Sequence, residues 1–181
     1  MFIPGRARMR TNGDVWELYI PTSPVPASRP RVGRWGTYYS KTYQTWMRTV
    51  DDLLRPLKKN AAPTGEIIHV SIHMACTKPR TGELSHPRGD LDNYVKAACD
   101  AVTRSELIWL DDRQVVTEQA TKRYAIADEE AHTFIRASLT MAGVWLPDPL
   151  RGLGEDVYDL PPSMRVPLDL LLDGGDGEGA K

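Results

Sequence analysis

The alternation of apolar and polar residues predicts four strands in this chain. Residues 14–20 alternate and predict a first strand, and residues 66–76 show the clearest period of two. The latter segment places one apolar set on a single face: Ile68, Val70, Ile72 and Met74. Residues 113–126 and 133–141 predict two further strands around an intervening turn.

Helical spacing of apolar residues predicts two helices between these strands. The segment 41–59 begins after Ser40, which can serve as an N-cap, as can Thr42. The segment 91–103 has a stripe of apolar and small residues that predicts its buried face: Leu91, Val95, Ala98, Cys99 and Val102. The intervening segment 21–36 is rich in proline and glycine, which excludes regular structure throughout it.

The order β-α-β-α-β-β predicts an α+β (mixed α/β) fold, with a mixed sheet and helices packed on one face. We expect one domain over residues 14–146, preceded by an N-terminal extension at 1–13. Residues 147–181 are acidic and rich in proline and glycine, which predicts a partly disordered tail.

Composition and charge narrow the class of protein. No apolar run reaches the length of a membrane-spanning helix, and the N-terminus lacks the apolar stretch of a signal peptide. We therefore expect a cytoplasmic protein without a membrane partner. The two cysteines, Cys76 and Cys99, lack metal-ligand spacing and are expected to be buried, reduced thiols.

The net charge of −1 conceals an asymmetry along the chain. Residues 1–60 carry 11 Lys and Arg against 4 Asp and Glu, whereas residues 147–181 carry 3 against 8. A basic N-terminal third beside an acidic cluster is typical of a nucleic-acid binder that carries its own metal site.

Five aspartates and a lysine form the most informative cluster. Asp92, Lys96 and Asp100 share one polar flank of the second predicted helix, and Asp90 precedes its first turn. Asp111 and Asp112 follow after a short loop. Carboxylate oxygens suit Mg²⁺, which also retains water and takes phosphate oxygens, and a lysine nearby can stabilise developing negative charge.

Each of these residues also has a purely structural interpretation. Asp90 and Asp92 are good N-capping residues, Asp92 and Lys96 are spaced for a surface ion pair, and Asp111 with Asp112 can form a turn. All three interpretations would have to hold together to remove the predicted metal site.

The cluster resembles the signature of the RusA family of Holliday junction resolvases. The matching residues are Asp90-Leu91-Asp92-Asn93, Lys96-Ala97-Ala98, Asp100-Ala101 and Asp111-Asp112-Arg113-Gln114-Val115-Val116. The similarity extends over about residues 14–141, including Arg29-Pro30-Arg31 of phage-type members. Gly89 stands where relatives often have a basic residue or proline.

This resemblance implies a homodimeric, Mg²⁺-dependent endonuclease, with Mn²⁺ as a substitute and no nucleotide cofactor. It implies that Asp90, Asp92 and Asp112 hold metal, with Asp111 as a further candidate, and that Lys96 is catalytic. The expected activity is paired symmetric nicking of four-way junctions in recombination and repair, in a phage or its bacterial host. The alternatives are a non-catalytic DNA-binding or packaging protein on the same fold and a nuclease for other branched or flapped DNA.

Basic residues in the turn-rich segment and on both sides of the acidic cluster predict the DNA-binding surface. In the turn-rich segment they are interleaved with aromatic residues suited to stacking, although a solvated loop explains the same pattern. The predicted contacts are Arg29, Arg31, Arg34, Lys41, Arg88, Arg113 and Lys122.

Overall fold

The computed structural model describes residues 5–34, 36–81 and 84–141, which all belong to one compact unit, Phe2–Pro149. The predicted tail at 147–181 lies outside the described residues, as does Trp35.

A five-stranded mixed sheet forms one layer of the domain. Its order is β1-β2-β7-β5-β6, and only β5 and β6 are parallel neighbours. The strands are β1 (Arg8–Thr11), β2 (Val15–Ile20), β5 (Ile68–Cys76), β6 (Val115–Tyr124) and β7 (His132–Ser138).

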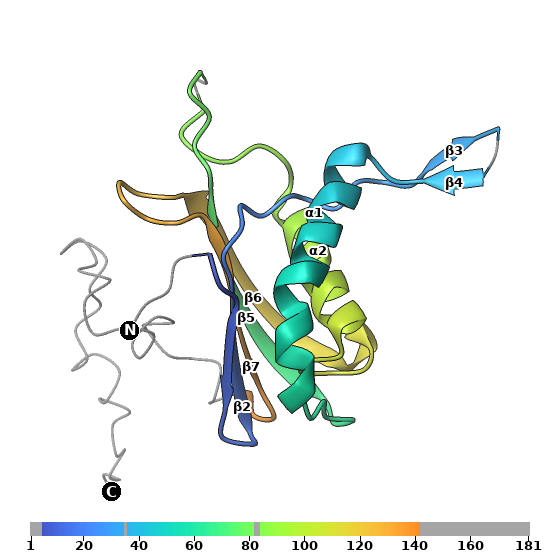
Figure 1. Cartoon of the computed structure of the whole chain (residues 1–181), viewed down its shortest axis with the longest axis vertical. Helices are drawn as coiled ribbons and strands as arrows, with labels where there is room; N and C mark the ends of the chain where they lie inside the picture. Colours follow the sequence, from blue (N-terminus) through green and yellow to red (C-terminus); the bar gives the residue numbers. More distant parts are fainter. Residues whose placement is uncertain (1–4, 35, 82–83, 142–181) are drawn as a thin grey trace, which may run out of the picture. The chain divides into compact units, whose positions relative to one another are not determined.

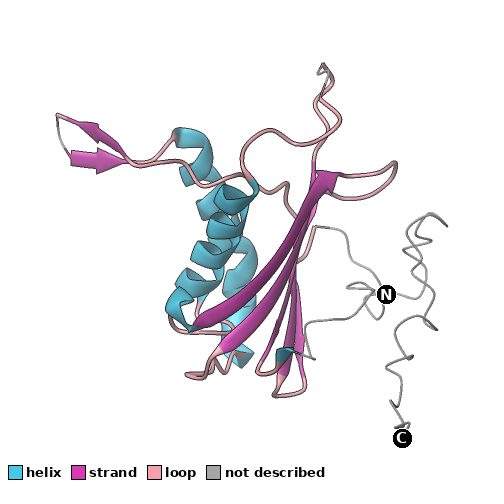
Figure 2. Cartoon of the chain, turned by 180° about the vertical axis from the view of Figure 1, so that it is seen from behind, coloured by secondary structure: helices cyan, strands magenta, loops and turns pink. Residues whose placement is uncertain are grey.

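Two helices, α1 (Lys41–Leu54) and α2 (Leu91–Ser105), cover one face of this sheet (Figure 1, Figure 2). The Ser40 hydroxyl caps α1 by accepting a hydrogen bond from the Tyr43 amide at 3.3 Å. The predicted α+β fold with helices on one face of a mixed sheet is therefore confirmed.

The parallel pairing of β5 and β6 requires a long connection, and this connection contains α2. Parallel neighbours cannot be joined by a tight hairpin, so the chain must return through a helix from the end of β5 to the end of the sheet where β5 begins. The returning segment is anchored by Leu107, Ile108 and Trp109, which are all fully buried. This crossover puts the Asp90–Asp112 motif along one continuous β-α-β unit.

The core lies between the helices and the sheet. Ile68, Val70, Ile72 and Met74 of β5 belong to it, as the alternation predicts. The neighbouring strands add Trp16, Leu18, Ile20, Ile135 and Ala137. Both cysteines are buried and free, as predicted.

The structure begins its sheet earlier than the sequence pattern indicates. Residues within the predicted N-terminal extension form β1, which pairs with β2 through a turn at Asn12-Gly13. The side chain of Asn12 accepts hydrogen bonds from the amides of Asp14 and Val15, and Gly13 has a φ of +99°. An Asn-Gly pair is a strong hairpin signal, but β1 has polar residues on both faces and shows no apolar alternation.

A basic hairpin also interrupts the turn-rich segment. Strands β3 (Arg31–Gly33) and β4 (Gly36–Tyr38) pair only with each other and project from the helix layer (Figure 1). We call the segment Arg31–Tyr38 the arm. Val32 within it is 87% exposed.

Three further differences concern element ends and faces. The first predicted helix ends as α-helix at Leu54, and η1 (Arg55–Asn60) continues as 3₁₀ helix because Pro56 cannot donate the next backbone bond. The last two strands are shorter than predicted, because η2 (Asp112–Gln114) precedes β6 and β7 ends at Ser138. The prediction that Leu91 is buried is wrong, since it is 37% exposed at the first turn of α2.

No helix among the described residues is long and apolar enough to cross a membrane.

Replacing Ile72 by alanine tests the assigned core. Ile72 has no exposed surface at the middle of β5, whereas Ile67, just before the strand, is 58% exposed. We expect Ile72→Ala to lower the free energy of unfolding by about 2–5 kcal/mol in urea titrations, because it leaves a cavity. Ile67→Ala should change it by less than about 0.5 kcal/mol. Equal losses in the two variants would contradict the assignment.

Candidate active site

The N-terminus of α2 presents two carboxylates that the fold does not use. Asp90 is the N-cap residue by backbone position, but its side chain makes no capping hydrogen bond. Asp90 and Asp92 are both exposed, and neither makes a hydrogen bond or ion pair with other described residues. Carboxylates here are favoured by the positive end of the helix dipole. The capping interpretation therefore does not account for either side chain.

Lys96 pairs with Asp100, one turn further along α2, and not with Asp92. Its ammonium lies 3.3 Å from an Asp100 carboxylate oxygen, and the Tyr43 hydroxyl donates to the other oxygen at 2.8 Å. The Asp100 carboxylate raises the pKa of Lys96, with a smaller contribution from Asp112. Lys96 is thus a fixed cation at neutral pH and not a proton acceptor.

The loop before β6 is organised by Gln114. Its side-chain oxygen accepts from the amides of Leu110 and Asp111 at 2.9 and 3.0 Å. Its amide nitrogen donates to the carbonyls of Thr64 and Glu66 at 2.9 and 2.7 Å. All four hydrogen-bonding positions are used, so Gln114 fastens this loop to the segment that leads into β5.

Asp111 and Asp112 have different environments despite being neighbours. The Asp111 side chain caps η2 and binds Arg113 at 2.8 Å, and this hydrogen bonding lowers the pKa of Asp111 to about 2. The turn interpretation therefore holds for Asp111. Asp112 is exposed and makes no ion pair with described residues.

Asp112 and Glu118 both act on the same flank of α2. Burial raises the pKa of Cys99 to about 12, and the charges of Glu118, Asp112 and Asp100 add to this effect. Cys99 is therefore a neutral thiol packed under an acidic surface. Glu118 is not among the residues predicted for the site, although the alternation of β6 places it on the same face as Ala120 and Lys122.

The predicted metal ligands fit a hard cation in their chemistry. All three are carboxylates, and two of them have no partner among the described residues. No three Asp, Glu, His or Cys side chains in the described part lie close enough to hold a metal ion as they stand. Mutual repulsion alone favours such separation of like charges.

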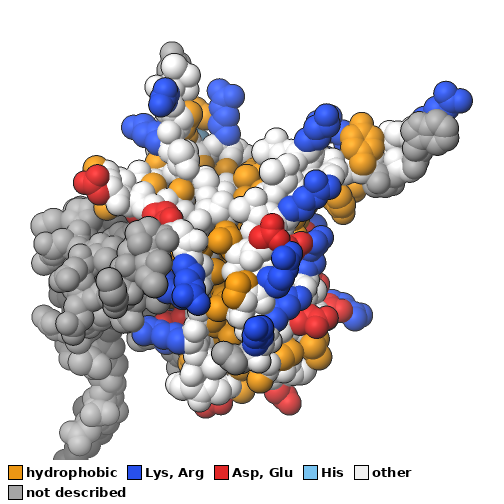
Figure 3. All heavy atoms as spheres, in the orientation of Figure 1, with side chains coloured by type: hydrophobic (Ala, Val, Ile, Leu, Met, Phe, Trp, Pro, Cys, Tyr) orange, Lys and Arg blue, Asp and Glu red, His pale blue; other side chains and the backbone are white. Residues whose placement is uncertain are grey.

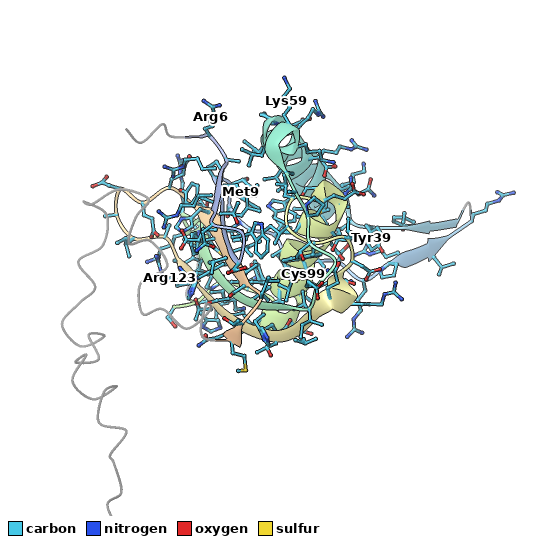
Figure 4. All side chains as sticks on the ribbon, turned by 90° about the horizontal axis from the view of Figure 1, so that it is seen from below. Arg6, Met9, Tyr39, Lys59, Cys99 and Arg123 are labelled. Atoms are coloured by element: carbon cyan, nitrogen blue, oxygen red, sulfur yellow. The ribbon has the colours of Figure 1, made fainter. Side chains whose placement is uncertain are left out.

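The predicted DNA contacts divide into two groups. Arg29, Arg31, Arg34 and Lys41 are all exposed on the arm or beside it, and Figure 3 shows Lys and Arg side chains on the arm and along the helix layer below it. An open groove of about 470 Å³ between α1 and α2 is lined by Tyr39, Arg48 and Asp100, among other residues. Tyr39 lies at the base of the arm (Figure 4).

Hydrogen bonds hold the two segments that flank the arm, and one of these bonds reaches the first turn of α2. The Ala27 amide donates to the Asn93 carbonyl at 2.8 Å, and the Ser40 amide donates to the Ser28 hydroxyl at 2.9 Å. The segment that leads into the basic arm therefore lies beside the helix turn that carries Asp92.

The second group of basic residues lies near the acids. Arg88 is exposed two residues before Asp90. The guanidinium of Arg113 is bound to Asp111, and the ammonium of Lys122 is bound to the backbone carbonyls of Pro87 and Gly89. Of these three, only Arg88 has no assigned partner among the described residues.

Exposed acids, a fixed ammonium and a basic arm define a domain suited to handling a phosphodiester backbone. A family model described as Endodeoxyribonuclease RusA matches residues 21–136. The chain belongs to this family of endodeoxyribonucleases, which confirms the resemblance found in its motifs and the prediction that it is a hydrolase.

Individual relatives agree with the family model. The chain is 35% identical over 107 residues to crossover junction endodeoxyribonuclease RusA of Escherichia coli strain K12, covering 58% of this chain and 82% of the relative. It is 34% identical over 109 residues to the enzyme of the same name from Enterobacteria phage 82, covering 60% and 83%.

Among solved structures, the periplasmic domain of Helicobacter pylori MotB matches with a TM-score of 0.35 and 9% identity. That match covers 73% of this chain and 78% of the other. A likeness this distant carries no functional argument.

Replacing Gln114 by alanine tests its role as the fastener of the Asp111–Asp112 loop. We expect Gln114→Ala to lower the free energy of unfolding by about 2 kcal/mol, because four hydrogen bonds are lost and their partners remain. Gln119→Ala, at an exposed position of β6, is the matched control and should be nearly neutral. Urea titrations of both variants measure the difference, and a neutral Gln114→Ala would contradict the role.

Proposed function

We propose that this chain resolves four-way DNA junctions by divalent-metal-dependent hydrolysis of phosphodiester bonds. What supports the proposal is the contrast among the acids of the motif. Asp100 and Asp111 are bound by neighbouring side chains, whereas Asp90 and Asp92 stay exposed without a partner among the described residues. Hydrogen bonds within the fold hold Asp100 and Asp111, whereas Asp90 and Asp92 are left available to bind a metal ion.

In this proposal Asp90, Asp92 and Asp112 hold Mg²⁺, for which Mn²⁺ can substitute. When bound, the ion would supply Lewis-acid chemistry at the phosphate and at the attacking water. The remaining work falls to the protein. Lys96, kept protonated and oriented by Asp100, offsets the negative charge that develops at the phosphate.

The proposed substrate is branched DNA, as the names of the relatives indicate for those proteins. Phosphates beside the branch are contacted by four exposed basic residues, Arg29, Arg31, Arg34 and Lys41. Arg88 contacts the DNA strand near Asp90 and Asp92. A junction has two equivalent strands, so a two-fold dimer would place one site on each and produce paired symmetric nicks.

Substituting Asp92 separates cleavage from binding. We expect Asp92→Asn to reduce Mg²⁺-dependent nicking of an end-labelled four-way junction by roughly a hundred-fold or more, the scale on which charge-stabilising groups act. Junction affinity measured in EDTA should change little. Asp128→Asn is the matched control, because Asp128 is exposed in a left-handed turn that asparagine tolerates.

Three results would count against the proposal or redirect it. Loss of junction binding with intact nicking in Asp92→Asn would refute the metal role. Absence of nicking by the unmodified protein would favour a non-catalytic DNA-binding or packaging protein. Cleavage of flaps but not junctions would favour the alternative branched substrate.

The arm makes a separate electrostatic prediction. We expect the double variant Arg31→Gln/Arg34→Gln to weaken junction binding and to lower the salt slope of the affinity by about 2, if each arginine neutralises one phosphate. Lys58→Gln/Lys59→Gln, at the end of η1, is the matched charge control. Affinities measured over a range of NaCl concentrations decide the matter, and equal slopes for both variants would contradict the assignment.

A further inference from the structure

The turn that leads into α2 is held by side chains from distant parts of the chain. The ammonium of Lys122 donates to the Pro87 carbonyl at 3.0 Å and also to the Gly89 carbonyl. The Tyr94 hydroxyl donates to the intervening Arg88 carbonyl at 2.9 Å. Three successive carbonyls immediately before Asp90 therefore each accept a side-chain hydrogen bond.

Both donors are themselves fixed by the core. Lys122 lies on β6 opposite Met74, on the face that packs against the helices, and its ammonium lies 5.2 Å from the centre of the Tyr94 ring. Tyr94 is buried in α2, which directs its hydroxyl to the Arg88 carbonyl. The turn is thus tied at once to the sheet and to the helix it precedes.

The turn is also crowded at Gly89 by the side chains of Pro26 and Tyr94. Gly89 has a φ of +94°, and a Cβ at this position would lie 3.3 Å from Pro26 Cγ. A side chain here would be strained by the backbone as well as crowded. The turn therefore has little freedom to move, and the backbone of Asp90 follows it directly.

We propose that Lys122 is a positioning residue that sets the Asp90 turn for metal binding, together with Tyr94. The inference rests on the proposed function and assigns Lys122 a role other than the predicted DNA contact. Its ammonium already serves two carbonyls and an aromatic ring, so little of its donor capacity remains for phosphate. A charged donor shared between two carbonyls is also stronger than a neutral one.

Lys122→Met is the sharpest test, because it removes the ammonium and keeps an unbranched side chain against Tyr94. We expect the affinity of the DNA-free protein for Mn²⁺, measured by electron paramagnetic resonance of the free ion, to fall about 10–100-fold, the scale for outer partners of metal ligands. The Mg²⁺ concentration for half-maximal nicking should rise in parallel. Junction affinity in EDTA and its salt slope should stay unchanged.

Three further variants control this test. Lys122→Arg retains a cationic donor and should recover most of the Mn²⁺ affinity. Lys59→Met makes the same chemical change on η1, where Lys59 projects outward (Figure 4), and should leave Mn²⁺ affinity unchanged. Tyr94→Phe removes the third hydrogen bond of the turn, together with the contact of the hydroxyl with the Cys76 thiol. It tests the turn even if Lys122→Met fails to fold, and should lower Mn²⁺ affinity several-fold.

The outcomes separate this inference from the proposed function. Unchanged Mn²⁺ affinity in folded Lys122→Met and Tyr94→Phe would overturn it, even with a lower melting temperature. A weaker junction affinity and a smaller salt slope with unchanged Mn²⁺ affinity would make Lys122 a DNA contact instead. Failure of the unmodified protein to nick any junction would count against the proposed function, while the Mn²⁺ measurements still decide the role of Lys122.

Discussion

The architecture depends on the parallel pairing of β5 and β6. That pairing obliges the chain to cross back over the sheet, and α2 is the crossing element. The crossing begins at Asp90 and ends at Asp112, the first residue of η2, which leads directly into β6. Asp90 and Asp112 are 22 positions apart in the sequence. Their relative position is therefore determined by the crossover between paired strands and not by local structure alone. Buried Leu107, Ile108 and Trp109 keep the return path in place.

Electrostatics then sorts the acidic residues into two populations. Asp100 and Asp111 are paired, and they fix a lysine and a loop respectively. Asp90 and Asp92 lie at a helix N-terminus, where the backbone amides stabilise negative charge. The Asp90 side chain accepts no capping hydrogen bond there. The proposed chemistry needs both populations, since a reactive group is useful only when its neighbours are fixed.

The sequence predicted those parts of the fold whose apolar pattern is local. The alternation of Ile68 to Met74 and the stripe containing Val95 and Val102 both lie in the core. Strand β1 and the arm were missed because neither buries a continuous apolar face, so only turn signals such as Asn12-Gly13 mark them. Leu91 is exposed although the helical wheel predicts that it is buried, because a wheel does not show which turns of a helix the rest of the fold covers.

The sequence predicts a set of candidate site residues but not their pairings. Spacing alone allowed Lys96 to bind Asp92 or Asp100, and the choice depends on Tyr43, which lies on another helix. The contacts of Gln114 with Thr64 and of Lys122 with Pro87 span long stretches of chain. Such contacts depend on which strands are neighbours, and a single sequence does not state that order.

Strand β6 has one further consequence. It forms an edge of the described sheet and is ten residues long, with exposed backbone that could template pairing with another chain. Its side chains include Glu118, Lys122 and Arg123 within six positions, and charge at this density opposes edge-to-edge association. The same strand that supports the acidic site is thus also protected against aggregation, including the fibrous assembly to which long uncharged edges are prone.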